Sequence, residues 1–160
     1  MKIKIISEAD IQEWILLSKE YDGYVQEIAS DLTEWYDGND TSLSFDNYMK
    51  AKINKSEAFM AIDDNGCCGI IAISKTNNRI TFFAISHKHD FNLVGEFILN
   101  YAIMQLNINR GITINVIKSN VAQIQKEHLL LKKFNFQLSH DDFENGVPVN
   151  SFILNPLCTE

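Results

Sequence analysis

The sequence predicts an α/β (α+β) fold, in which a central mixed, mostly antiparallel sheet of about seven strands is flanked by roughly four to five helices. Three observations lead to this prediction: short apolar or alternating runs, turn signals such as Asn-Gly that separate them, and amphipathic helical runs in between. The predicted order is strand, two or three helices, three strands, helix, strand, helix and two strands (β-α-α-(α)-β-β-β-α-β-α-β-β).

Composition favours a single domain over residues 1–160, because 46% hydrophobic residues are enough for one core. The formal charge of −7, without a cluster of Lys or Arg, excludes a duplex nucleic-acid surface and suits a cationic small substrate. No apolar run has the length of a membrane span or the pattern of a signal peptide. We therefore expect a cytoplasmic protein with no nucleic-acid or membrane partner.

The N-terminal third of the chain is predicted to form one strand followed by helices. Lys2 to Ile6 has the pattern of a short strand, and Ser7 to Asp10 has the pattern of a capping box that opens a helix. Apolar residues from Tyr24 to Tyr36 recur at three- and four-residue steps, which predicts a helix that the turn formers Asp37 to Asp40 end. A further short helix is expected around Phe45 to Ile53.

The middle of the chain predicts a three-stranded meander that leads into a helix. Glu57 to Asp63 and Cys67 to Ser74 flank Asp64-Asn65-Gly66, a strong hairpin signal. Arg79 to Ser86 follows a second turn, and an amphipathic helix begins near Asn92 and runs to Leu106.

The C-terminal part predicts a crossover and a closing hairpin. Gly111 to Ile117 is expected to form a strand parallel to the one before the preceding helix. Asn120 is expected to cap the next helix, which runs to Phe134. Phe136 to His140 and Val147 to Leu154 then form a hairpin around an Asn-Gly turn.

The three cysteines predict neither a metal site nor a disulfide framework. Cys67 and Cys68 are neighbours in one predicted strand, so their side chains should point to opposite faces, and Cys158 lies in the tail. The alternative, a catalytic thiol at Cys67 or Cys68, stays open at this point.

The stretch from Arg79 to Leu106 combines a strand, a tight turn and a helix N-terminus. Such a unit can bind an anion, because the first helical N–H groups lack intrahelical partners and carry the positive end of the helix dipole. The alternative is a strand that is only packed on a helix.

Two segments, FFAISHKHDFNLVGEFIL and SNVAQIQKEHLLLKKFNFQL, together with the element order, resemble the GNAT superfamily of acyl-CoA-dependent N-acyltransferases over essentially the whole chain. The first lies where the family has its pyrophosphate loop, Arg/Gln-x-x-Gly-x-Gly/Ala. The resemblance implies acetyl-CoA (coenzyme A) as co-substrate, no metal, and direct acetyl transfer to a primary amine of a small molecule or peptide. The exposed last strands, which often pair between subunits in this family, allow a homodimer.

The resemblance also implies site residues. A backbone N–H around Ile85 would polarise the thioester carbonyl, and Asn120 would reach the pantetheine amides. The pyrophosphate would lie on the backbone of the loop and first helical turn, at Phe91, Asn92, Leu93, Val94, Gly95 and Glu96.

Two positions depart from the family pattern. Asp90 replaces the basic or amide residue of the loop, where a carboxylate is unfavourable, although Lys88, His87 or His89 could supply positive charge. Leu131 replaces the tyrosine that often protonates the leaving thiolate, a loss that lowers the rate without abolishing transfer.

The general acid and base are not identified by the resemblance. Glu57 and Asp63 are candidates for the base, as is a water relay, and His128 is a candidate proton donor, although each also fits an ordinary surface charge. In this family the early helices wall the acceptor site, which implies Tyr24 and Trp35 as substrate contacts, with core packing as the alternative.

Two functions therefore remain. The leading hypothesis is an N-acetyltransferase, which Gly95 and Asn120 favour. The alternative is a catalytically weak or inactive GNAT-fold module for acyl-CoA binding or interaction, which Asp90 and Leu131 favour.

Overall fold

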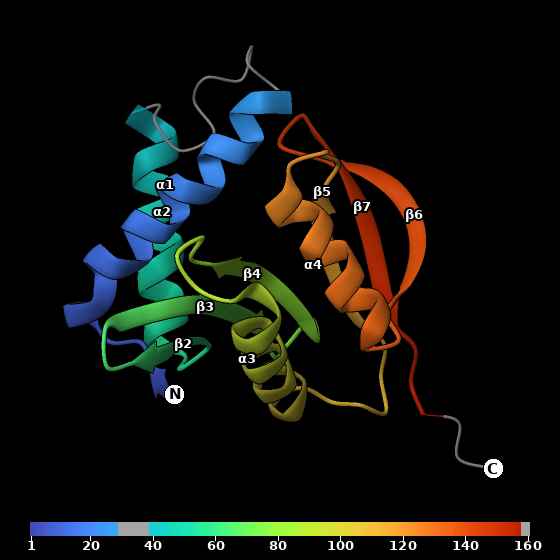
Figure 1. Ribbon diagram of the computed structural model, residues 1–160, viewed down its shortest axis with the longest axis horizontal. Helices are drawn as coiled ribbons and strands as arrows, with labels where there is room; N and C mark the ends of the chain where they lie inside the picture. The colour runs from blue at the N-terminus through green and yellow to red at the C-terminus, as the bar shows by residue number, and fades with distance from the viewer. Residues whose placement is uncertain (29–38, 158–160) are drawn as a thin grey trace.

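A seven-stranded sheet with the order β1-β2-β3-β4-β5-β7-β6 runs through the computed structural model, which describes residues 1–28 and 39–157 (Figure 1). Neighbouring strands are antiparallel except β4 and β5, which are parallel. The predicted fold class is confirmed. The elements are β1 (Lys2–Ile5), the 3₁₀ turn η1 (Glu8–Asp10), α1 (Ile11–Ile28), α2 (Asn39–Asn54), β2 (Ala58–Asp63), β3 (Gly66–Ser74), β4 (Arg79–Ile85), α3 (Phe91–Gln105), β5 (Ile112–Ile117), α4 (Ala122–Lys133), β6 (Gln137–Glu144) and β7 (Val147–Leu154).

The N-terminal helices differ in their limits from the prediction. The backbone N–H and the hydroxyl of Ser7 both donate to Asp10 Oδ2, over 2.9 and 3.1 Å, which confirms the predicted cap. The described part of the predicted Tyr24–Tyr36 helix continues α1 without a break, and its remainder lies outside the described residues. The prediction of a turn at Asn39 and Asp40 was wrong, because α2 begins at Asn39. Asn and Asp favour helix N-termini as well as turns, so residue type could not separate the two.

The sheet separates two layers of core. On one face the first half of α1, with Trp14 and Leu17, and α2, with Met49, pack on Met60 and Ala72. On the other face α3 and α4 pack on the alternate strand residues, and the second half of α1 reaches the same layer through Val25. In Figure 1 strands β3 and β4 run in a different direction from strands β6 and β7. Helix α1 contributes side chains to both layers of the core.

The C-terminal half corrects one capping prediction. Helix α4 begins at Ala122 with Val121 at the N-cap, so Asn120 is not the cap. Ser119 is the local hydrogen-bonding residue instead, because its hydroxyl accepts from the Val121 N–H over 3.1 Å. Strand β6 runs to Glu144 rather than His140, because its pairing with β7 continues as far as Glu144 with Val147. The added residues are exposed, and Phe143 is the one apolar side chain among them, so no alternating pattern marks the extension.

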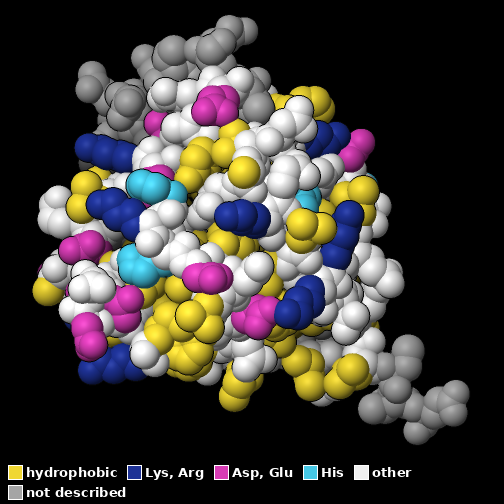
Figure 2. Space-filling model, in the orientation of Figure 1, with side chains coloured by type: hydrophobic (Ala, Val, Ile, Leu, Met, Phe, Trp, Pro, Cys, Tyr) yellow, Lys and Arg dark blue, Asp and Glu magenta, His cyan; other side chains and the backbone are white. Residues whose placement is uncertain are grey.

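The surface has no gathered basic patch on the face shown in Figure 2, where Lys and Arg lie scattered among acidic and polar side chains. No helix in the described residues combines the length and the apolar character needed to cross a membrane.

Candidate functional site

The parallel strands β4 and β5 pair only at their beginnings and then diverge. Their register contains two pairs, Arg79 with Thr113 and Ile80 with Ile114. The buried Asn78 holds this end closed, because its side chain bonds the backbone of Asn107 at both its Oδ1 and its Nδ2, over 2.8 and 2.9 Å. Beyond these pairs the two strands separate, so their facing backbone N–H and C=O groups no longer bond each other and border an open space.

A cavity of about 240 Å³ lies where β4 and β5 diverge. Helices α1, α2 and α4 and the turn between β6 and β7 complete its walls. The described residues that line it are Tyr21, Phe45, Tyr48, Ile80, Thr81, Phe82, Phe83, Ile114, Asn115, Ile117, Glu127, Glu144 and Asn145.

Ile85 does not line this cavity but a small pocket beside it, which it shares with Glu127. The backbone of Ile85 faces the space between the diverging strands. The N–H of Ser86 donates to Cys68 O over 2.9 Å, and the alternation of an antiparallel ladder then turns the N–H and C=O of Ile85 away from β3. The Ile85 carbonyl accepts from Gln123 Nε2 of α4 over 2.9 Å. The Ile85 N–H thus points into the divergence, as its predicted role requires, and that role stays a prediction.

Sequence reasoning missed Glu127. Its side chain projects from α4 to the cavity wall, and the residue is only 4% exposed. Burial raises the pKa of its carboxyl group to about 8, so the group exchanges protons near neutral pH. A signal was present: Glu127 stands three residues after Ile124 and three before Leu130, on the apolar face of α4.

Two of the first backbone N–H groups of α3 already donate to Asp90, which precedes the helix. The carboxylate of Asp90 accepts from the Leu93 N–H over 3.0 Å, and the Asp90 carbonyl accepts from the Val94 N–H over 3.1 Å. His87 binds Glu20 through its ring, and His89 is oriented toward Asp63. Of the three basic residues predicted to supply charge here, only Lys88 has no carboxylate partner within the described part of the chain.

The predicted cofactor residues of α3 divide between core and surface. Phe91, Val94 and Gly95 are buried, whereas Asn92 and Leu93 are exposed and Glu96 pairs with Lys133. A Cβ atom on Gly95 would lie 2.7 Å from Leu130 Cδ2, so a larger residue there would force the Leu130 side chain to move. A ligand at this turn would therefore contact backbone N–H groups rather than these side chains.

Several predicted residues lie away from the cavity. Asn120 and His128 line a separate hollow between α4 and β7, and Leu131 is fully buried in the core. Tyr24 bonds Glu20, and burial, together with that carboxylate, raises the pKa of its hydroxyl to about 12. Trp35 lies outside the described residues.

The two carboxylates considered as bases have other partners. Glu57 is buried, accepts from the Lys75 N–H over 2.6 Å and pairs with Lys52 over 3.6 Å. Asp63 lies 3.5 Å from the ring of His89. Neither lines the cavity, so within the described residues Glu127 is the buried carboxyl group that faces it.

No model of a protein family matches the sequence, and no curated protein matches it. Solved structures do match. A GNAT-family acetyltransferase from Streptococcus agalactiae 2603 is 16% identical with a TM-score of 0.66, over 98% of this chain and 96% of that one. An N-acetyltransferase from Staphylococcus aureus Mu50 is 14% identical with a TM-score of 0.67, over 96% and 97%. Arabidopsis thaliana Naa50, in complex with the bisubstrate analogue CoA-Ac-MVNAL, is 14% identical with a TM-score of 0.64, over 96% and 97%.

These similarities extend over nearly the whole chain, from the first strand to the closing hairpin. The chain therefore has the GNAT fold, which confirms the resemblance seen in its sequence.

Proposed function

We propose that this chain, which has the GNAT fold, transfers the acetyl group of acetyl-CoA directly to a primary amine, with Glu127 as the general base. The observation that carries the proposal is the buried Glu127 carboxyl group at the point where β4 and β5 diverge. Its pKa of about 8 lies near the working pH, where proton transfer is effective, and the carboxylate form that accepts the proton gains population as the pH rises toward 8.

The reaction needs three groups in one place. The thioester carbonyl lies against the Ile85 N–H, which stabilises the oxyanion that forms on attack. The Glu127 carboxylate takes a proton from the incoming ammonium group, and the free amine attacks the carbonyl carbon. The C–N bond forms, the C–S bond breaks, and the departing thiolate takes the second proton of the amine. The products are the N-acetyl amine and coenzyme A.

Leu131 lies at the position where the family often has a tyrosine acid, and it is buried in the core. A thiolate leaves without full protonation, so transfer proceeds more slowly rather than not at all. The loss of one positioned acid lowers a rate by roughly 10²- to 10⁴-fold. We expect a slow enzyme.

The cavity lining favours a cationic acceptor. Tyr21, Phe45 and Tyr48 supply aromatic rings, and Glu127 and Glu144 supply carboxyl groups. Aromatic faces and carboxylates both attract ammonium ions. We propose a small amine or the amino group of a peptide, in keeping with the net charge of −7.

The second candidate is a module that binds acyl-CoA without turning it over. The Asp90 carboxylate favours it, because it occupies a helix N–H and places negative charge where a pyrophosphate would lie.

The test is release of the coenzyme A thiol in the presence of polyamines, aminoglycosides, amino acids and peptides. We expect Glu127→Gln to lower kcat by roughly 10²- to 10⁴-fold while acetyl-CoA still binds. Glu144→Gln is the matched control, because Glu144 lines the same cavity but is exposed, so its loss should raise KM for a cationic acceptor and leave kcat nearly unchanged. Binding without turnover for any acceptor would identify the binding module, and no binding of acetyl-CoA by calorimetry would end both proposals.

A further inference from the structure

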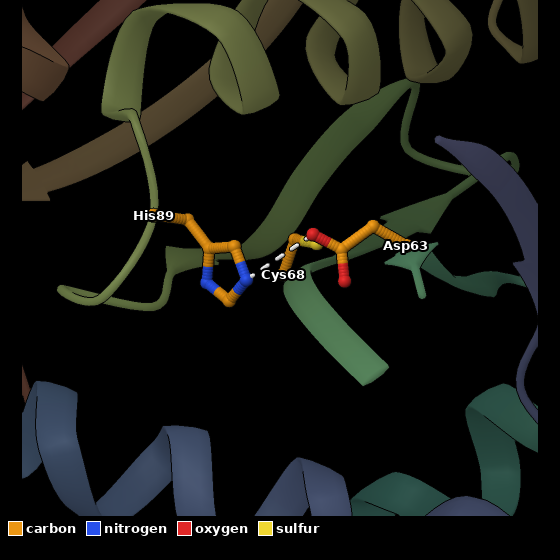
Figure 3. Close-up of side chains that lie close together, drawn as sticks. All are labelled: Asp63, Cys68 and His89. Atoms are coloured by element: carbon orange, nitrogen blue, oxygen red, sulfur yellow. Dashed lines mark ion pairs between the residues drawn. The ribbon is translucent and has the colours of Figure 1, made fainter. Parts of the chain in front are cut away.

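Asp63, Cys68 and His89 converge outside the proposed active site (Figure 3). Asp63 ends β2, Cys68 lies in β3, and His89 lies in the turn between β4 and α3. One carboxylate oxygen, the thiol sulfur and a ring nitrogen all lie within 4.8 Å of one another. In Figure 3 the three side chains point toward a common centre.

A β-bulge directs Cys68 to this centre. The β2–β3 register passes from Ala61 with Gly69 to Ile62 with Cys67, so Cys68 is the extra residue without a partner on β2. Bulges redirect side chains, and they are common beside functional sites. Cys67 belongs to the opposite layer of the core, which confirms that the two thiols face opposite sides of the sheet.

His89 has few other polar neighbours. Its Nε2 lies 3.5 Å from Asp63 Oδ2, and its Nδ1 is buried without a hydrogen-bond partner among the described residues. The other carboxylate oxygen of Asp63 accepts from the Asn65 N–H over 2.7 Å, which leaves Oδ2 directed toward the ring. The Cys68 thiol donates to the Gly66 carbonyl over 3.6 Å, a weak contact that a metal–sulfur bond would replace.

A nucleophilic thiol fits these contacts poorly. The Cys68 thiol interacts with the Asp63 carboxylate rather than with the imidazole that would have to deprotonate it. Burial and that carboxylate raise the pKa of Cys68 to about 11, and the residue is 1% exposed. A buried thiol of this kind is unreactive unless a cation stabilises its thiolate.

We propose that Asp63, Cys68 and His89 bind one divalent transition-metal ion, with zinc as the best fit and water as the fourth ligand. One thiolate, one imidazole and one carboxylate form a borderline-soft set that favours zinc or cobalt over magnesium or calcium. Tetrahedral zinc places N and O ligands about 3.3 Å apart, close to the His89–Asp63 distance, and requires the sulfur to move inward by up to about 1 Å. The Asp63 side chain is 32% exposed, which provides a route of entry.

Binding replaces the S–H bond of Cys68 with a metal–sulfur bond, and the proton passes to solvent. The ion then connects the β2–β3 hairpin to the turn that precedes α3. Because an ion that binds only the folded chain stabilises it, zinc should raise the melting temperature of the protein.

The test titrates the full, reduced, chelator-treated chain with Co²⁺ and follows the thiolate-to-cobalt absorption band, with Zn²⁺ then added in competition. We expect one Co²⁺ per chain, a tetrahedral spectrum and loss of the band in Cys68→Ser. Cys67→Ser is the matched control and should keep the band, because its thiol lies on the other face. His89→Gln keeps the thiol and should weaken binding at least tenfold.

Circular dichroism of each variant establishes that it is folded. The proposal is overturned if the parent shows no thiolate band, or if Cys67→Ser loses the band while Cys68→Ser keeps it. Cobalt binding of the same affinity in His89→Gln would also contradict it, because the metal would then be held without the histidine ligand.

Discussion

The Asp90 carboxylate accepts a hydrogen bond from the Leu93 backbone N–H over 3.0 Å, so the chain's own anion lies at the N-terminus of α3. Replacing Asp90 with Ser keeps a capping oxygen and removes the charge. We expect Asp90→Ser to bind acetyl-CoA about two- to fivefold more tightly in calorimetry, because a charge at a helix end contributes roughly 0.3–1 kcal/mol.

Asp64→Ser is the control for that experiment, since Asp64 is an exposed acid in the β2–β3 turn. It should leave the affinity unchanged, and the gain from Asp90→Ser should shrink as salt screens the charge. Equal gains in both variants would mean that net charge, not the helix end, sets the affinity.

Glu127 links stability to pH. Its folded-state pKa of about 8 lies above the ordinary value of 4.5, so between these values the folded chain holds the proton more strongly than the unfolded chain. Stability is therefore greatest below the ordinary pKa and falls as pH rises through the folded one. We expect Glu127→Gln to be more stable than the parent at pH 9, by an amount on the order of several kcal/mol, and to show no such difference at pH 4.

Urea denaturation at the two pH values measures this difference. Glu144→Gln keeps Glu127, so its stability should follow the parent's pH dependence, and the difference between the two should not change between pH 4 and pH 9. A parent whose stability is the same at both pH values would contradict the burial of an ionisable Glu127.

Lys52 and Glu57 form a largely buried pair that joins α2 to the sheet. Lys52 Nζ lies 3.6 Å from Glu57 and donates to the Ile73 carbonyl over 2.5 Å. We expect Lys52→Met or Glu57→Gln alone to cost about 3–5 kcal/mol in chemical denaturation, because each leaves a buried charge without its opposite charge. The double variant should cost less than the sum.

The exposed pair Asp46–Lys50 of α2 is the contrast, and Asp46→Asn should have little measurable effect. Additive single and double effects at Lys52 and Glu57 would show that the two side chains do not depend on each other.

Gly95 lies against the Leu130 side chain of α4. We expect Gly95→Ala to destabilise the chain by roughly 1–3 kcal/mol, because its new methyl group would meet Leu130. Adding Leu130→Ala should recover part of that loss in a double-mutant cycle.

Gly23→Ala in α1 is the matched helical control, since a Cβ there meets nothing within 4 Å. It should stabilise the chain by up to about 1 kcal/mol. Destabilisation at both glycines would point to backbone conformation rather than to contact with Leu130.

Local signals in the sequence were sufficient for the elements and their order. Ser7 and Asp10 form the predicted capping box, and Asn145 and Gly146 turn the last hairpin with φ of 51° and 82°. These features depend on residues a few positions apart, so the chain displays them directly. The element order then carried the resemblance to the GNAT fold, which the structural comparisons confirm.

Local signals did not predict the limits of an element where the same residue types favour two different local structures. Asn39 and Asp40 fit a turn or a helix start equally well, and Asn120 is a good cap that lies outside α4. The local sequence alone does not choose between these structures.

The sequence by itself thus determined the order of the secondary-structure elements and the fold class, because periodicity and turn chemistry are local properties. Only the tertiary structure decided which polar groups are buried and which of them meet. Glu127 is exchangeable near neutral pH because α4 packs it beside the divergence of β4 and β5. Asp63, Cys68 and His89 converge because a bulge and a turn bring distant residues together. Burial and proximity of this kind arise from packing between segments, which no spacing along the chain records.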